Sequence, residues 1–238
     1  ADYVQTSHIG VKIGHGVGLH YHYGTLGQLE QGVNYAHAYF KNIGIKTTSP
    51  RILKSWPYAD RAPLKLFILA GHRNMEGERA FTQQLDPEHT KLAQDNHSIA
   101  FKYKLGGGYK ASQSWEPLGP PGYYDTFGPE LSFAKTISTR QLDSFAIAKF
   151  THSGSQMNDW TPNGSIAKAR HLYPDFIRFV KEAINELEAK GHAVSLEGIF
   201  YHIGENEMSM PPYRKQTPQW LGELVTQSRL DFKLPKLK

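Results

Sequence analysis

Three histidines stand where apolar runs of the sequence give way to polar segments. His72 and His152 closely follow such runs, and His202 lies near the end of one. Carboxylates occur near them in the sequence, namely Glu76, Glu205 and Glu207. An imidazole beside a carboxylate can transfer protons as a general acid or base, so these residues form a candidate catalytic group.

Two serines add a candidate nucleophile to this group. Ser153 and Ser155 follow His152 in the segment THSGSQMNDW, and a neighbouring imidazole can activate a serine by taking its proton. The same segment also has the composition of a glycine-containing turn that two serines simply line. The sequence favours the turn, and His152 and Ser155 remain the catalytic candidates of the other interpretation.

A second histidine group, near the amino terminus, suggests a metal site. The segment HGVGLHYHYG contains His15, His20 and His22, and an HxH pair on a strand presents both imidazoles on one face, as a zinc or copper site requires. The flanking tyrosines suit ordinary amphipathic packing equally well. The possible metal ligands are therefore His15, His20 and His22, and no cofactor is expected.

Aromatic residues occur in segments rich in glycine and proline. They could stack on sugar rings or could anchor long loops to the core, and the sequence leaves both open. The residues are Trp115, Tyr123, Tyr124, Phe127 and Trp160. The run Gly106-Gly107-Gly108 lacks the spacing of a nucleotide-binding loop, which disfavours a nucleotide ligand.

Composition limits the possible partners. The chain has 238 residues, 39% of them hydrophobic, which is enough for a sizeable core. The formal net charge is +5, but the 27 basic and 22 acidic residues are interspersed, so no nucleic-acid partner is expected. No apolar stretch is long enough to predict a membrane span. The lack of cysteine excludes a cysteine nucleophile.

Four short apolar runs predict the strands that must position these residues. They cover Leu64–Ala70, Ile99–Tyr103, Ser144–Phe150 and Leu196–Ile203. Helical patterns follow them, beginning near Gly128-Pro129-Glu130, at Pro174 and at Pro218. This alternation predicts a parallel sheet covered on both faces, with ligands at the carboxyl ends of its strands. Residues 1–61 lack a long helical period and are expected to form a separate irregular or strand-rich segment.

Four ordered motifs resemble the SGNH hydrolases, in the branch of sialate O-acetylesterases and acetyl-xylan esterases. AGHRNMEGE at Ala70–Glu78 is similar to the AGQSNM block of that branch, and GPELSFA begins with the glycine of its second block, Gly128. KFTHSGSQMNDW and FYHIGENE resemble its remaining blocks, the latter matching WYQGE. The resemblance implies an α/β protein, a three-layer α/β/α sandwich with a mostly parallel, flavodoxin-like sheet over residues 62–238. It also implies a carbohydrate or acetylated polysaccharide as the partner.

The sequence departs from the family motifs at the positions of the family's catalytic residues. Asn74 keeps the family residue, but Arg73 stands at the position of the serine nucleophile, and a guanidinium cannot form an acyl-enzyme. Ile203 replaces a glutamine that could face the oxyanion. The family's terminal Asp and His have no counterpart before Lys238, and we expect a natural chain that continues with a last strand.

Three functions therefore remain open. The first is a carbohydrate esterase-like protein with degenerate catalytic residues, and the second is a carbohydrate- or polymer-binding pseudoenzyme. The third is a metal or protein-interaction role of residues 1–61. Glu205, at the family's Gly-Glu position, is expected to be structural, either pairing with Arg73 or capping the turn. The carbohydrate resemblance and the start at Ala1 predict a secreted or periplasmic protein, and nothing in the sequence fixes its oligomeric state.

Overall fold

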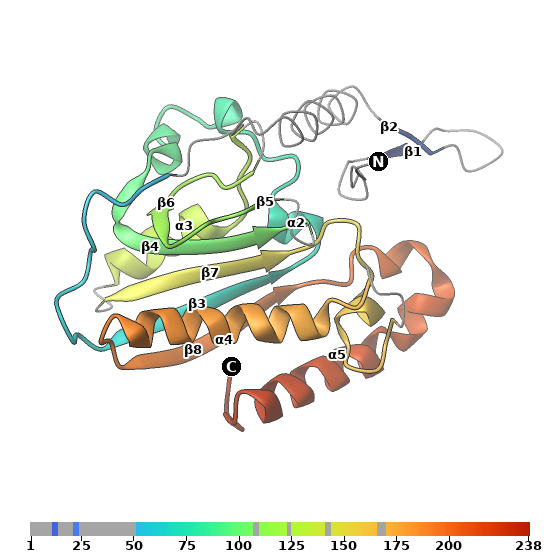
Figure 1. Ribbon diagram of the computed structural model, residues 1–238. Helices are drawn as coiled ribbons and strands as arrows, with labels where there is room; N and C mark the ends of the chain where they lie inside the picture. Colours follow the sequence, from blue (N-terminus) through green and yellow to red (C-terminus); the bar gives the residue numbers. More distant parts are fainter. Residues whose placement is uncertain are drawn as a thin grey trace, which may run out of the picture. The chain divides into compact units, whose positions relative to one another are not determined.

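The computed structural model describes residues 51–106, 110–122, 125–140, 144–165 and 170–238, together with the backbone of two short strands near the amino terminus (Figure 1). These strands, β1 (Val11–Ile13) and β2 (Tyr21–Tyr23), pair antiparallel. The chain divides into two compact units, residues 1–51 and 52–238. Of the candidate metal ligands, His15 and His20 lie outside the described residues, and only the backbone of His22 is described.

The four predicted strands are the parallel strands of one sheet. They are β3 (Leu64–Gly71), β4 (Asn96–Leu105), β7 (Phe145–Thr151) and β8 (Val194–His202). In the order β5-β4-β7-β3-β8, strand β3 lies between β7 and the edge strand β8 and pairs with both. Two strands too short to give a sequence pattern, β5 (Lys110–Ala111) and β6 (Glu116–Leu118), pair antiparallel with β4.

The helices follow the strands as the patterns indicate. They are α2 (Arg73–Glu76), α3 (Glu130–Thr139), α4 (Tyr173–Ala189) and α5 (Pro211–Asp231). The 3-10 turns are η1 (Thr82–Gln84), η2 (Thr90–Ala93), η4 (Met157–Trp160) and η5 (Glu207–Ser209). The predicted start of the last helix at Pro218 is wrong. The prolines Pro211 and Pro212 occupy its first turn, where a missing N–H costs nothing, and Pro218 lies inside the helix.

Helices cover both faces of the sheet, which confirms the three-layer α/β/α architecture. Figure 1 shows α4 in front of the sheet and α3 behind it. On the α4 face, Phe176, Val180 and Leu187 are fully buried and pack in one cluster with Leu224 of α5. On the other face, Leu131 and Ala134 of α3 pack in a second cluster. Each large buried side chain contributes about 1.5–3 kcal/mol to folding.

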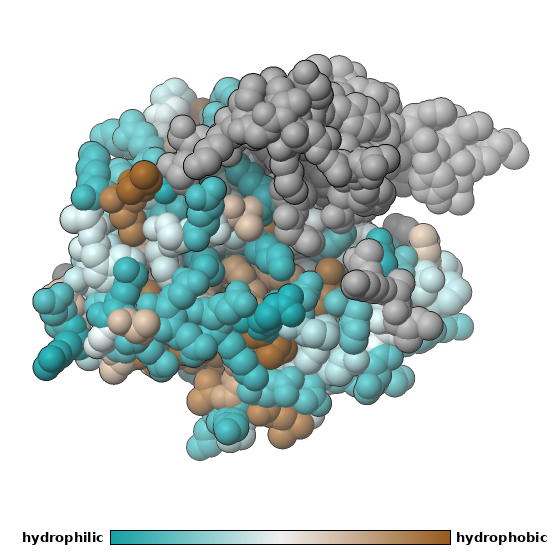
Figure 2. Space-filling model, viewed as in Figure 1, coloured by the Kyte–Doolittle hydropathy of each residue, from teal (hydrophilic) through white to brown (hydrophobic). Residues whose placement is uncertain are grey.

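The outer surface of α4 is charged, in keeping with an amphipathic helix. Figure 2 shows mostly hydrophilic residues on the side of the molecule that α4 faces. Arg178 and Glu182, for example, are more than half exposed. None of the described helices has the length and apolarity needed to cross a membrane.

Residues 52–61 belong to the second unit and pack against its sheet. The Tyr58 hydroxyl donates to the carbonyl of Phe145 at 2.5 Å and accepts the N–H of Ala100 at 2.9 Å. The Trp56 indole donates to Nε2 of His192 at 2.7 Å. This segment therefore joins β4, β7 and the loop before β8 at the end of the sheet opposite the candidate site.

Candidate active site

The carboxyl ends of three adjacent strands bring the predicted residues together. Gly71 at the end of β3 is in register with Thr151 of β7 and His202 of β8. The N–H of His72 donates to the carbonyl of His202, and the N–H of His152 donates to the carbonyl of Gly71, both at 3.0 Å. The predicted grouping of the three histidine segments at one end of the sheet is thus confirmed.

Gly71 allows this close approach of β3 and β8. Its φ is 155°, and a Cβ on this residue would lie 2.1 Å from the carbonyl oxygen of His202. No side chain fits in that space, so the turn into α2 requires glycine here.

Arg73, at the position of the family serine, is the first residue of α2. Its side chain is exposed, as is that of Asn74. Among the described residues, the guanidinium of Arg73 has no hydrogen bond and no ion pair, and the expected pair with Glu205 does not form. The strand-turn-helix unit therefore places an exposed cation, unpaired within the described part of the chain, just after the carboxyl end of β3.

Glu205 instead holds the start of α2. One carboxylate oxygen lies 3.4 Å from Nδ1 of the fully buried His72, and the other accepts the N–H of Asn74 at 3.4 Å. Burial favours a higher pKa for Glu205, but hydrogen bonds and the charge interaction with His72 outweigh burial and lower the pKa. Glu205 is thus a carboxylate that positions the turn after β3.

The two residues that follow hold the loop after β7. The side-chain amide of Asn206 donates to the carbonyl of Ser155 at 2.5 Å, and Glu207 accepts the N–H of Met157 at 2.6 Å. Glu207 is buried. The segment 205–207, called the clamp below, therefore joins the loops that follow β3, β7 and β8.

Ser155 lies inside this clamped loop. Its Oγ is buried, donates to the carbonyl of His152 at 2.6 Å and accepts the indole N–H of Trp160 at 2.9 Å. His152 is also buried. A hydroxyl held by the backbone and an indole has the bonding of a turn residue, which is the interpretation that the sequence favoured.

A buried polar network supports the turn from below. Lys149 and Glu130 are both fully buried, and Nζ of Lys149 lies 2.7 Å from the Glu130 carboxylate. The same ammonium donates to the carbonyl of Glu76 at 3.0 Å. The Glu76 carboxylate in turn accepts the hydroxyl of Thr151 at 2.9 Å and the N–H of Gly106 at 3.1 Å. Sequence reasoning missed Lys149, because a lysine in a strand normally indicates an exposed position.

Gly128 lies directly on this network. Its N–H donates to the Glu130 carboxylate at 2.9 Å, and an added Cβ would lie 2.2 Å from the carbonyl oxygen of Met75. This N–H is therefore bonded to the protein rather than turned toward a ligand.

A groove opens between α2 and the start of α3. Its volume is about 520 Å³, and its walls come from residues 73–74, 77–80, 127–129, Ser132 and His202. Two arginines, Arg73 and Arg79, contribute to these walls. Sequence reasoning missed Arg79, because the wall that it joins is completed by distant residues, namely 127–129, Ser132 and His202.

The aromatic residues divide between the groove and the core. Phe127 lines the groove and is partly exposed. Trp115 and Trp160 are 5% and 0% exposed, so they anchor loops to the core instead of offering a face to a sugar. Tyr123 and Tyr124 lie outside the described residues.

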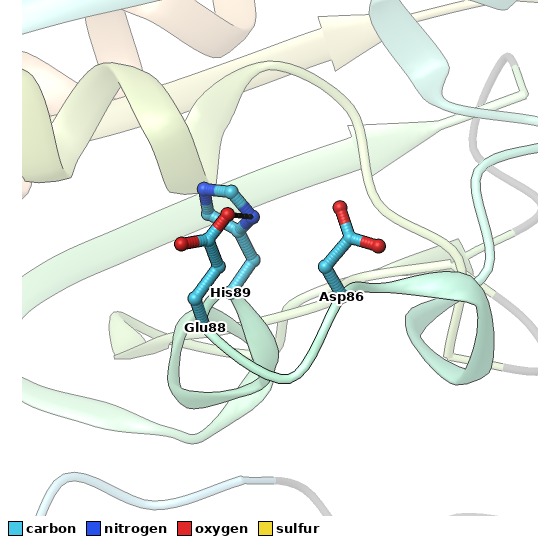
Figure 3. A group of neighbouring side chains, drawn as sticks. All are labelled: Asp86, Glu88 and His89. Atoms are coloured by element: carbon cyan, nitrogen blue, oxygen red, sulfur yellow. Dashed lines mark ion pairs between the residues drawn. The ribbon is translucent and has the colours of Figure 1, made fainter.

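One group of side chains outside this region has a spacing that suits a cation. Asp86, Glu88 and His89 place one ligand atom each within 4.8 Å of one another. Figure 3 shows these three side chains. Asp86 and Glu88 are exposed, and their loop comes between η1 and η2. Exposed acidic groups commonly occur without a metal, and this group has no buried ligand to organise one.

Comparisons with known proteins agree with this architecture. Residues 63–238 match the family described as carbohydrate esterase, sialic acid-specific acetylesterase. A protein from Arabidopsis thaliana of known crystal structure is 19% identical, with a TM-score of 0.55 over 74% of this chain and 71% of that one. NanS is 15% identical, with a TM-score of 0.53, and this chain spans 64% of its length. A comparison with curated proteins gives no significant match.

Proposed function

Because the chain belongs to the sialic acid-specific acetylesterase family of carbohydrate esterases, we propose that it binds carbohydrate without cleaving acetyl esters. The ligand class is the one that the family name gives, and it includes sialic acid. The groove between α2 and α3 is the proposed binding site. The main observation in favour of lost catalysis is that Arg73 is the first residue of α2. In the esterases that this sequence resembles, the serine nucleophile occupies this position.

The chemistry of Arg73 supports this proposal. A guanidinium stays protonated, offers only hydrogen-bond donors and cannot attack a carbonyl carbon. Arg73 is among the residues that line the groove. Arg73 therefore both removes the nucleophile and occupies its place with a cation.

Two further contacts support the same proposal. Ser155, the alternative nucleophile, has its Oγ engaged by the His152 carbonyl and the Trp160 indole. The N–H of Gly128, which could otherwise stabilise an oxyanion, donates to Glu130. Neither group is free to act on an ester bound in the groove.

Hydrolysis assays with p-nitrophenyl acetate, acetylated xylan and O-acetylated sialic acid test the proposal. We expect the wild type to release acetate no faster than the uncatalysed reaction, and Ser155→Ala to behave identically. Turnover by the wild type that disappears in His152→Ala or Ser155→Ala, with each variant still folded by circular dichroism, would show that a displaced catalytic set operates.

Binding is tested separately, by titrating mono- and oligosaccharides into the protein and following changes in its amide NMR spectrum. Shifts concentrated on residues 73–80 and 127–132 are expected. A secreted or periplasmic location goes with this function and is checked by fractionating the source cells.

A further inference from the structure

We propose that residues 52–57, called the strap below, form an acid-sensitive latch that two uncharged histidines hold against the sheet. His97 and His192 each accept a hydrogen bond from a donor of the strap. Figure 1 shows this segment, in blue, at the end of the sheet where β3 begins. The latch is therefore separate from the groove and from the carbohydrate binding proposed for it.

The contacts of His192 determine its protonation state. An indole N–H can only donate, so Nε2 of His192, 2.7 Å from the indole nitrogen of Trp56, must accept. A carbonyl oxygen can only accept, so Nδ1, 2.9 Å from the carbonyl oxygen of Ala62, must carry the hydrogen. His192 is 4% exposed, which leaves little room for water to replace these partners. Both ring nitrogens are thus satisfied only in the neutral imidazole.

His97 holds the strap in the same way from a different element. It lies on β4, and its Nδ1 accepts the backbone N–H of Lys54 at 3.2 Å. A proton added to this nitrogen, or to Nε2 of His192, would leave two hydrogen-bond donors facing each other. The strap therefore loses its hydrogen bonds to both histidines when their rings become charged.

The groups around the rings do not compensate for an added charge. The ammonium of Lys190 lies 4.5 Å from the centre of the Trp56 ring, and the side chain of Arg61 lies beside the loop that carries His192. Tyr58 faces His192 edge-on at 5.9 Å, and burial raises the pKa of Tyr58, so it stays uncharged. In the described part of the chain, no carboxylate pairs with His97 or His192. Charged residues next to these contacts in the sequence are exposed, namely Lys54, Asp60, Asp95 and Glu188.

Opening of the strap should become easier in acid. The closed strap requires both imidazoles to be uncharged, whereas solvated imidazoles take up protons at their ordinary value of about 6.5. Opening is therefore coupled to proton uptake and is favoured as the pH falls below about 6.5. The hydroxyl of Tyr58 does not titrate in this range and keeps its bonds to Phe145 and Ala100. Acid thus loosens the chain up to Tyr58, which remains anchored.

Loosening of the strap changes both its surface and its reach. Leu53 and Trp56 pack against the core cluster on the α4 face, and their burial favours the closed strap. Opening exposes these two side chains to solvent. Because the strap is the first part of the second unit, its opening also lengthens the free chain that follows residues 1–51.

Hydrogen exchange of the full chain, followed by NMR from about pH 8 to about pH 5, tests the proposal. The indole N–H of Trp56 reports on His192, and the amide N–H of Lys54 reports on His97. The indole N–H of Trp160 is the internal control, because it donates to the hydroxyl oxygen of Ser155, which does not titrate. Exchange rates are corrected for their intrinsic dependence on pH. At pH 8, nitrogen-15 spectra should show the imidazole hydrogen of His192 on Nδ1.

We expect the opening equilibrium at Trp56 to rise by at least about tenfold between about pH 8 and about pH 5, and that at Trp160 to stay unchanged. His192→Gln keeps an acceptor and a donor but does not titrate, so it should remove most of the rise at Trp56. The double variant with His97→Gln should remove the rise at both reporters. His89→Gln is the control, since it changes a histidine that pairs with Glu88 instead of the strap.

Trp56→Phe provides a test that does not depend on the folding of the histidine variants. It keeps an aromatic ring and removes the indole donor, so the acid-induced rise at the amides of residues 53–56 should be smaller than in the wild type. Three results would overturn the inference: a wild-type opening equilibrium that does not change with pH, an equal rise at Trp160, which indicates loosening of the whole fold, or an undiminished rise in Trp56→Phe or the double histidine variant.

Discussion

Beneath the groove, Lys149 and Glu130 are fully buried and bonded to each other, whereas Arg73 and Arg79 in its wall are exposed and have no bonded partner among the described residues. A buried charge without a partner is costly, so the lower layer tolerates little change. An exposed charge is solvated and constrains folding little. The lower layer thus fixes the backbone of the site, and the upper layer determines what the site can bind or react with.

The largest effect on stability is expected when the buried ammonium of Lys149 is removed. Lys149→Met should lower the free energy of unfolding by about 3–5 kcal/mol, because the Glu130 carboxylate is left buried without its partner. Urea denaturation measures the loss. The exposed Lys135→Met on α3 should change stability by less than about 0.5 kcal/mol. Equal effects of the two substitutions would show that the lower layer is not specially constrained.

A smaller loss is expected where the backbone segments touch. Gly128→Ala places a Cβ 2.2 Å from the carbonyl oxygen of Met75 and should cost about 1–3 kcal/mol through overpacking. Gly222→Ala in α5 is the matched control, since nothing lies within 4 Å of its added Cβ. We expect it to stabilise the protein by up to about 1 kcal/mol. Urea denaturation of both variants gives the comparison, and a stable Gly128→Ala would contradict the tight contact.

Glu205 contacts the buried His72 and the exposed Asn74, and its contribution to stability should depend on pH. Its lowered pKa means that folding favours the ionised carboxylate, so its contribution is complete above the ordinary value of 4.5 and is lost as the pH falls below it. Glu205→Gln should therefore cost about 0.5–1 kcal/mol at pH 7 and progressively less toward pH 3. Denaturation of wild type and variant across this range measures the difference. A difference that does not change with pH would exclude the carboxylate as its source.

The smallest effect on stability is expected in the groove wall. Arg73→Ser should change the free energy of unfolding by less than about 0.5 kcal/mol, because the exposed side chain has no protein partner to lose. Thermal and urea denaturation measure this directly. A loss of more than about 1 kcal/mol would mean that Arg73 belongs to the structural layer.

The strands and helices that could be predicted are those marked by a local pattern of apolar residues or by prolines at a helix start. The apolar runs identified β3, β4, β7 and β8, because strands buried on both faces require hydrophobic residues throughout. The stripe of α4 and the prolines near α3 and α4 identified those helices. The start of α5 was missed because three prolines occur near it, and any of them could open a helix.

The parts of the site that could not be predicted depend on contacts between distant segments. Glu205 was expected to contact Arg73, but it contacts His72 and Asn74, because its direction depends on how β8 ends beside β3. The burial of Lys149 depends on Glu130 in another element. Neither relation leaves a local pattern in the sequence.

The clamp at residues 205–207 has a consequence for local opening of the site. Its members accept the N–H of Asn74 after β3 and the N–H of Met157 after β7, and Asn206 holds the carbonyl of Ser155 between them. Opening of the loop after β8 breaks all three contacts at once. The amide hydrogens of Asn74 and Met157 should then exchange with solvent through the same cooperative event, so that two loops far apart in the sequence behave as one unit of local unfolding.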